Sequence, residues 1–168
     1  VYVDSGAMYR AMTLFSMQHG YISSNHFDVV SLINNLENAH LEFIYNHSLG
    51  FGEMYLNKVN VEKTIRTLEV SNFVSKVSAT PEVRKKLVTI QKEMGKNKAV
   101  VMDGRDIGTV VFTDAELKIF MTSTAETRAQ RRFDELIQKG EQVSYNDVYT
   151  NVVERDRVDT TRKDSPLV

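Results

Sequence analysis

Hydrophobic residues along this chain follow two alternating patterns, short continuous runs and helically spaced stripes. Residues 1–3 form a run, and the stripe that follows it ends near Gly20. Similar stripes over residues 28–38 and 68–77 predict two further amphipathic helices. Because strands that alternate with such helices are typical of α/β proteins, we predict a parallel sheet flanked by helices.

The stretch between residues 41 and 61 departs from this alternation. Residues 41–45, 53–56 and 58–61 each carry strand signals, and residues 48–52 (Ser-Leu-Gly-Phe-Gly) are typical of a turn. These strands follow one another without helices between them. We therefore predict a small antiparallel insertion outside the main sheet.

Two continuous apolar runs in the second half, residues 99–102 and 117–121, predict strands buried on both faces of a parallel sheet. Thr80 followed by proline is a helix start signal, with Thr80 as the N-cap. Capping-box patterns at Ser123 and Ser144 predict the starts of the last two helices.

Composition narrows the function classes. A chain of 168 residues with 42% hydrophobic content can bury one substantial core. The net charge of -1 gives no general attraction to nucleic acid, so anion binding would come from local arginine clusters. Cysteine is absent, which excludes disulfides and thiolate metal sites and suits the cytoplasm. No apolar run is long enough to predict a membrane span.

The first candidate site is the run Asp103-Gly104-Arg105-Asp106, directly after a predicted strand. Ligands of open parallel sheets bind beyond this edge. Two carboxylates around an arginine could hold a magnesium ion and a phosphate side by side. The alternative is a charged turn closed by its own Asp–Arg bridge.

Three arginines, Arg128, Arg131 and Arg132, lie on the helix that Ser123 begins, away from its apolar stripe. Arg128 and Arg132 are like charges four residues apart, which is unfavourable unless an anion lies between them. A phosphate clamp and a solvated face, in which Arg131 pairs with Glu135, both fit this pattern.

Arg155, Asp159 and Arg162 share one helical face, which continues the line of Val148 and Val152. An apolar stripe that turns into Arg-Asp-Arg faces something polar and enclosed. A phosphate or a ribose would satisfy it, because arginine binds phosphate oxygens and aspartate accepts from hydroxyls. The alternative is a salt-bridge ladder on a solvated face.

Ser5 and Arg10 mark a further candidate site at the start of the first helix. A helix N-terminus with a free hydroxyl and a nearby arginine can bind phosphate. Alternatively, Ser5 is an N-cap and Arg10 is solvated. The histidines follow no ligand spacing and are given no role.

In sequence and order these segments resemble the bacterial cytidylate kinase family. The two most specific matches are Asp4-Ser5-Gly6-Ala7-Met8-Tyr9-Arg10 and Asp103-Gly104-Arg105-Asp106-Ile107-Gly108-Thr109. The resemblance implies a P-loop kinase fold, with core and lid over residues 1–37 and 78–168 and a nucleotide-binding insert over residues 38–77. It also implies transfer of a phosphoryl group from ATP, with Mg²⁺, to CMP or dCMP in pyrimidine metabolism.

The resemblance further implies roles for individual residues. Cytosine would be read by Ser75, Arg84 and Asp106, and uracil would leave the Asp106 carboxylate facing a carbonyl. The CMP phosphate would lie near Ser5, Arg10 and Arg105. Arg155 and Asp159 would bind the ribose, and Arg162 would belong to the same acceptor site. Arg128, Arg131 and Arg132 would join Arg105 in stabilising the transferred group, and Asp103 would contact the metal through water.

The family's G-x-x-G-x-G-K-[ST] phosphate loop, expected upstream of Asp4, is not in this sequence, nor are the final strand and helix expected after Val168. We therefore expect a cytidylate kinase piece that is inactive by itself, in a protein whose intact form is a monomeric cytoplasmic enzyme acting on nucleotides. The alternatives are a non-catalytic CMP-binding fragment and a kinase for another nucleoside monophosphate.

Overall fold

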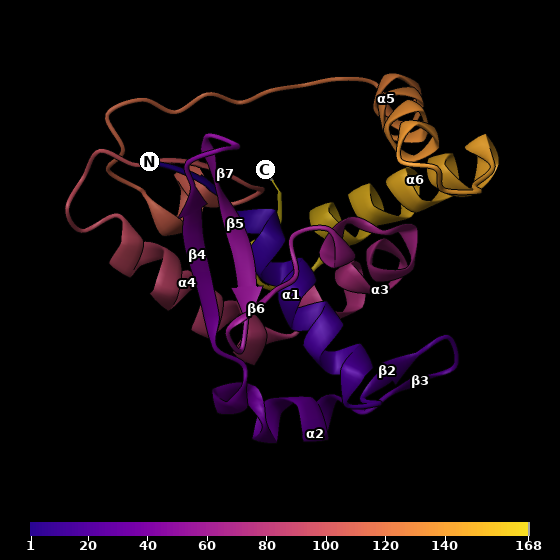
Figure 1. Cartoon of the computed structure of the whole chain (residues 1–168). Helices are drawn as coiled ribbons and strands as arrows, with labels where there is room; N and C mark the ends of the chain where they lie inside the picture. Colours follow the sequence, from indigo (N-terminus) through magenta and orange to yellow (C-terminus); the bar gives the residue numbers. More distant parts are fainter. Residues whose placement is uncertain (168) are drawn as a thin grey trace.

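The computed structural model describes residues 1–167, and it is an α/β arrangement with helices around a short parallel sheet (Figure 1). The helices are α1 (Ser5–Gln18), α2 (Val29–Asn34), α3 (Leu68–Ser78), α4 (Pro81–Met94), α5 (Ala125–Gln138) and α6 (Tyr145–Thr161). The strands are β1 (Tyr2–Asp4), β2 (Ile22–Ser23), β3 (His26–Phe27), β4 (Leu41–Asn46), β5 (Phe51–Leu56), β6 (Val59–Asn60) and β7 (Val101–Asp103). Three short helical turns complete it: η1 (Leu36–Asn38), η2 (Thr64–Arg66) and η3 (Ile107–Val111), the last a π-helix.

The parallel pairing of β1 with β7 positions the site. Tyr2 lies opposite Val101 and Asp4 opposite Asp103, so both strands end at the same edge. The carboxylate of Asp4 then accepts a hydrogen bond from the Ala7 backbone N–H (3.1 Å) and caps α1. One residue therefore ends a strand, begins a helix and places α1 against the carboxyl edge of the sheet.

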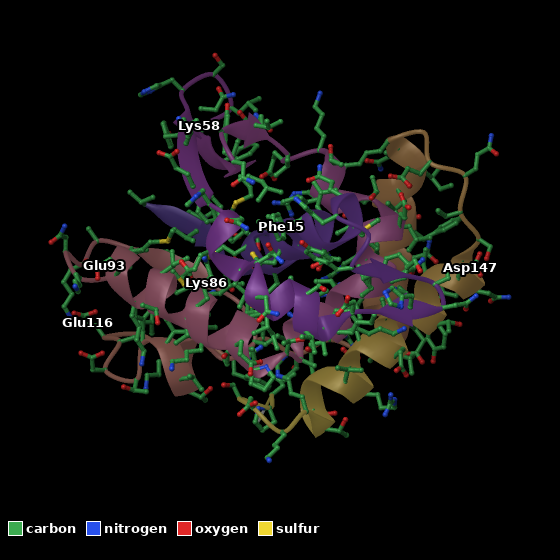
Figure 2. All side chains as sticks on the ribbon, turned by 90° about the horizontal axis from the view of Figure 1, so that it is seen from below. Phe15, Lys58, Lys86, Glu93, Glu116 and Asp147 are labelled. Atoms are coloured by element: carbon green, nitrogen blue, oxygen red, sulfur yellow. The ribbon has the colours of Figure 1, made fainter. Side chains whose placement is uncertain are left out.

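The largest group of buried apolar side chains surrounds α1. Phe15, Met8 and Met12 are almost fully buried there, and Phe15 lies in the interior in Figure 2. The predicted stripe is confirmed, because its apolar positions form this core. Thr13 and Ser16 are also buried, and their hydroxyls donate to backbone carbonyls four residues earlier, so their burial leaves no unmet donor.

Strands β4, β5 and β6 form the small antiparallel sheet that the sequence predicts. Phe43 pairs with Met54 and Leu41 with Leu56. Met54 and Leu56 are buried in the core around α1, which fixes one face of this sheet to the rest of the molecule.

The predicted strand over residues 117–121 is wrong. This segment is part of an extended connection toward α5 (Figure 1), and its apolar side chains are 67–87% exposed at Leu117, Ile119, Phe120 and Met121. A strand needs a neighbour for its backbone groups, and none of the strands within residues 1–167 pairs with it. The expected two-sided burial of residues 99–102 is also wrong, because Val101 is 67% exposed and, in the described part of the chain, β7 pairs with β1 alone.

Several helix starts differ in detail. Thr80 occupies the N-cap position of α4 with Pro81 after it, as predicted, but its hydroxyl donates to the Lys76 carbonyl and makes no capping hydrogen bond to the helix. The N-cap of α5 is Thr124, one residue after the predicted Ser123, whereas Ser144 caps α6 as expected. Of the helices in residues 1–167, none combines the length and the apolar character needed to cross a bilayer.

Candidate functional site

A cavity of about 210 Å³ opens at the carboxyl edge of β1 and β7. Residues from α1, α3, α4, α6 and the loop after β7 line it. The structure brings ten of the predicted site residues together here: Ser5, Arg10, Ser75, Arg84, Asp103, Arg105, Asp106, Arg155, Asp159 and Arg162. Arg128, Arg131 and Arg132, also predicted from sequence, are not part of this lining.

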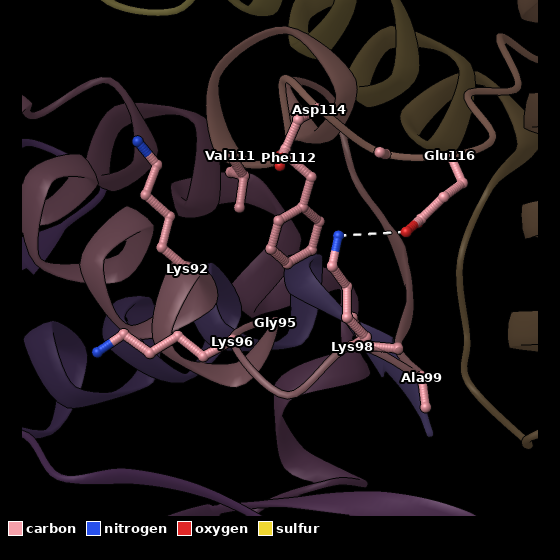
Figure 3. Close-up of a pocket in the computed structure, with 11 residues that line it drawn as sticks. Lys92, Gly95, Lys96, Lys98, Ala99, Val111, Phe112, Asp114 and Glu116 are labelled. Atoms are coloured by element: carbon pink, nitrogen blue, oxygen red, sulfur yellow. Dashed lines mark hydrogen bonds and ion pairs between the residues drawn. The ribbon is translucent and has the colours of Figure 1, made fainter.

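A second cavity, of about 320 Å³, lies between the end of α4 and the segment after η3 (Figure 3). The Phe112 ring lies so close to Gly95 that an added Cβ would be 2.3 Å from a ring carbon, and Lys98 Nζ pairs with Glu116 at 3.2 Å. This second cavity contains none of the predicted site residues. The smaller cavity is therefore the candidate active site.

One end of the candidate site holds a buried ion pair between Arg84 and Asp106, each 3% exposed. Arg84 also donates to the Ser78 carbonyl (3.1 Å), while its Nε has no partner within residues 1–167. Ser75 lines the cavity beside them. The pair offers one acceptor and one free donor, a combination that suits the edge of a planar polar ring.

A second buried cluster centres on Asp159 of α6. Its carboxylate accepts from Arg162 NH1 (2.8 Å) and from Arg105 Nε (2.9 Å). Asp159 is 5% and Arg162 is 9% exposed, so the solvated ladder on this helix is excluded. Arg105 pairs with Asp159 and Asp106 with Arg84, so the self-contained Asp–Arg turn is also wrong.

Positively charged side chains cluster in the part of the cavity where the sequence predicts that the CMP phosphate binds. Arg10 donates to Ser71 Oγ (2.7 Å), and burial together with nearby Arg155 and Arg132 lowers its pKa to about 9. Burial, then Arg105, also lowers the pKa of Arg155. Because neighbouring guanidinium groups repel one another, this part of the cavity favours an anion.

The Ser5 hydroxyl donates to the Asp103 carbonyl (2.6 Å), and Asp4 rather than Ser5 is the N-cap of α1. The N-cap interpretation of Ser5 is therefore wrong. Gly104 is required beside it, because an added Cβ would lie 2.2 Å from Ser5 Oγ. This close approach ties the Asp103-Gly104-Arg105-Asp106 segment to the start of α1.

A bridge centred on Arg66 was not predicted from the sequence. This side chain donates to Asp4 Oδ2 (2.9 Å) and to Glu62 Oε1 (2.6 Å). Glu62 is buried and accepts from the Met54 backbone N–H (2.9 Å), so the bridge joins the small sheet to the start of α1. The four-residue spacing of Glu62 and Arg66 was the available signal. Tyr9, which also lines the cavity, was missed as well.

The three arginines predicted to approach the ATP phosphates, Arg128, Arg131 and Arg132, lie outside the cavity in this structure. Arg128 makes a two-pronged ion pair with Asp156 (2.7 and 2.5 Å). Arg132 donates to Glu135 (2.8 Å) and to the Arg66 carbonyl. Arg131 is exposed, and the expected Arg131–Glu135 pair is replaced by pairs from Arg132 and Lys139 to that carboxylate.

Asp103 has the chemistry of a metal ligand, although it does not form a complete site. Burial and the neighbouring Asp4 carboxylate raise its pKa, and the Tyr2 hydroxyl donates to it (2.9 Å). A cation would relieve this repulsion. Within residues 1–167 no group of three or more Asp, Glu or His side chains could hold a metal ion, so a cation here would need ligands from a bound nucleotide or water.

Comparison with known proteins gives a consistent result. A family model described as cytidylate kinase matches residues 1–168. A curated protein named cytidylate kinase from Flavobacterium johnsoniae is 67% identical over all 168 residues, which cover 73% of its length. The proteins of the same name from Flavobacterium psychrophilum and Phocaeicola vulgatus are 61% and 52% identical. Those matches span 100% and 99% of this chain and 74% and 73% of the relatives.

Proposed function

The chain belongs to the cytidylate kinase family, and from this premise we propose that its candidate active site binds CMP or dCMP as the acceptor of a phosphoryl group. The protein is a nucleotide kinase that uses ATP as donor and phosphorylates CMP. The finer assignments below name which residues bind which part of the acceptor.

The buried Arg84–Asp106 pair, with Ser75 beside it, carries the assignment of the base. Cytosine presents an exocyclic amine next to ring acceptors, so Asp106 can accept from the amine while Arg84 and Ser75 donate to the ring. Uracil presents a carbonyl in place of the amine. Asp106 would then be a buried charge facing an acceptor, which is a costly mismatch.

We assign the ribose and the phosphate of the acceptor nucleotide from the charged side chains of the cavity. Asp159 would accept from the ribose hydroxyls, with Arg155 and Arg162 beside it. Arg10 and Arg105 would hold the phosphate close to the Ser5 hydroxyl. These groups would position the attacking phosphate oxygen and offset its charge, which is how proteins catalyse phosphoryl transfer.

The donor side involves movement of the helices α5 and α6, which we propose to be the lid. Arg128, Arg131 and Arg132 would reach the ATP phosphates when the lid closes, and Arg128 would then exchange Asp156 for phosphate. Asn151 of α6 donates to the Ser71 carbonyl (3.3 Å) and to Asn72 Oδ1 (2.9 Å) of α3, so lid and insert already touch. Closure would exclude water from the reaction.

Mg²⁺ is the proposed metal, held by ATP oxygens and, through water, by Asp103. When bound, it neutralises charge on the transferred phosphate. We further propose that residues 38–77 form the nucleotide-binding insert and residues 1–37 and 78–168 the core and lid. The enzyme would act as a cytoplasmic monomer on nucleotides rather than on nucleic acid.

A coupled assay of the full-length protein with CMP, dCMP, UMP and AMP tests the proposal. We expect CMP and dCMP to be phosphorylated with a kcat/KM well above that for UMP and AMP. Preferred turnover of UMP would contradict the assignment of Ser75, Arg84 and Asp106 as readers of cytosine. Absence of CMP turnover in an otherwise folded protein would contradict the function itself.

A further inference from the structure

Tyr9 of α1 lies on the wall of the candidate active site and has no role in the assignments above. Its side chain is buried, with 8% of the residue exposed, yet its hydroxyl has no hydrogen-bond partner within residues 1–167. Buried tyrosine hydroxyls normally find a partner, because an unmet polar group costs free energy. An orphaned hydroxyl at a cavity wall is therefore an observation that calls for a ligand.

Two further orphaned atoms lie around the same cavity. Arg84 Nε and Arg162 NH2 have no hydrogen-bond partner in the described part of the chain, and both residues line the cavity with Tyr9. Three of the four orphaned buried side-chain atoms in residues 1–167 thus belong to one cavity. The fourth, Gln91 Oε1, lies outside its lining. This concentration indicates that the groups are matched to a bound molecule rather than to one another.

The position of Tyr9 indicates which part of a nucleotide it would meet. The Arg84 guanidinium lies over its ring, 5.3 Å from the ring centre. Burial raises the pKa of Tyr9 to about 12, and the charges that act on it next are Arg84, Asp106, Arg162 and Asp159. The hydroxyl therefore keeps its proton at neutral pH. It feels the charges of both buried ion pairs, the pair proposed to bind the base and the pair proposed to bind the ribose.

We propose that Tyr9 is a further base-binding residue, whose hydroxyl donates a hydrogen bond to the 2-carbonyl oxygen of the cytosine base. In a cytidine nucleotide this oxygen is the acceptor of the base edge nearest the sugar, and Tyr9 lines the cavity together with the residues proposed to bind the base and the ribose. The aromatic ring has a second role, because it supports the Arg84 guanidinium from one side. The inference rests on the proposed function of this cavity.

The variant Tyr9→Phe tests the hydroxyl alone, since it keeps the ring beneath Arg84. We expect the Kd and KM for CMP and for dCMP each to rise about 3- to 10-fold, the loss typical of one hydrogen bond, with kcat within about 2-fold of wild type. The thermal midpoint without nucleotide should not fall, because no internal hydrogen bond is lost. Tyr21→Phe is the matched control, because it removes the hydroxyl of a tyrosine whose ring packs against Phe15 and His19 and which does not line the cavity.

The measurements are calorimetric titration with CMP and dCMP and steady-state kinetics on the full-length protein. Unchanged Kd values with normal wild-type turnover of CMP would overturn this inference and leave the proposed function intact. A loss for CMP but not for dCMP would place the contact on the 2′-hydroxyl and would also overturn it. Failure of the wild-type protein to phosphorylate CMP would instead refute the proposed function.

Discussion

The candidate active site and the proposed lid (α5 and α6) each contain an Arg–Asp ion pair, and the two pairs differ in burial. The side chains of Arg84 and Asp106 are each 4% exposed, whereas those of Arg128 and Asp156 are 35% and 33% exposed. A buried pair keeps its geometry because leaving it would strand a charge away from water. An exposed pair can exchange partners at little cost. The same chemistry therefore suits rigid recognition in one region and movement in the other.

Breaking the buried pair should have the largest effect. Asp106→Ala leaves the Arg84 guanidinium uncompensated, so we expect the protein to lose about 3–5 kcal/mol of stability. We also expect the preference for CMP over UMP to fall by at least about tenfold, while the KM for ATP stays within about threefold, because a hydrogen-bonding reader of the amine is lost. Denaturant unfolding and kinetics with both acceptors measure these effects. Equal losses for CMP and ATP would contradict the base-reading role.

Asp159→Asn tests the second buried cluster, and its effect should be smaller because the amide keeps a hydrogen-bond acceptor. Arg105 and Arg162 lose their shared carboxylate, so we expect the KM for CMP to rise about 10- to 100-fold, the range for hydrogen bonds to charged groups. Steady-state kinetics with CMP check this value. Asp164→Asn, close in sequence but outside the cavity lining, is the control and should leave the KM unchanged.

A substitution of Asp103 should have a smaller effect than those at Asp106 and Asp159, and this effect should depend on pH. Burial and Asp4 raise its pKa in the folded protein above the ordinary 3.8. Between the ordinary and the raised value the folded state binds more protons than the unfolded state, so ionisation of Asp103 lowers stability as pH rises through this window. We therefore expect Asp103→Asn to melt above wild type at pH 7. The difference should shrink as pH falls toward 3.8, and a constant difference across this range would contradict the carboxylate repulsion.

Asp156→Ala in the lid should have the smallest effect on stability. The pair is partly exposed and screened by solvent, so its loss should change the free energy of unfolding by at most about 1 kcal/mol. Urea unfolding at low and high salt measures this. A loss as large as that of Asp106→Ala would mean that the lid pair is rigid, and the contrast between the two regions would fail.

The sequence predicted those features of the site that depend on periodicity and on strand ends. The change from valine to Arg155, Asp159 and Arg162 along one face of α6 correctly indicated an enclosed polar environment. The segment after β7 was correctly placed at the edge of the parallel sheet. Both predictions succeed because backbone geometry alone fixes where such residues lie.

Features that depend on distant partners could not be predicted in this way. Residues 117–121 have a strand-like composition, but a strand also requires a neighbour, which composition does not supply. The partner of Arg128 is a side chain of α6, and Arg132 contacts the Arg66 carbonyl of η2 as well as Glu135 of its own helix, so these contacts depend on how distant elements pack. Tyr9 was given no role from the sequence, because its unpartnered hydroxyl becomes visible only in the folded structure, where Arg84 lies over its ring.

The parallel pairing of β1 with β7 also has a consequence for biosynthesis. The hydrogen bond from Ser5 to the Asp103 carbonyl joins residues 98 positions apart, whereas β4 and β5 pair within a contiguous hairpin. Contacts between distant residues form late, because a long loop must close first. On the ribosome, the small sheet can therefore assemble while the carboxyl edge of β1 still waits for β7. We expect the nascent chain to complete its nucleotide site after the β4–β5 hairpin has formed, and β1 to lack its β7 partner until then.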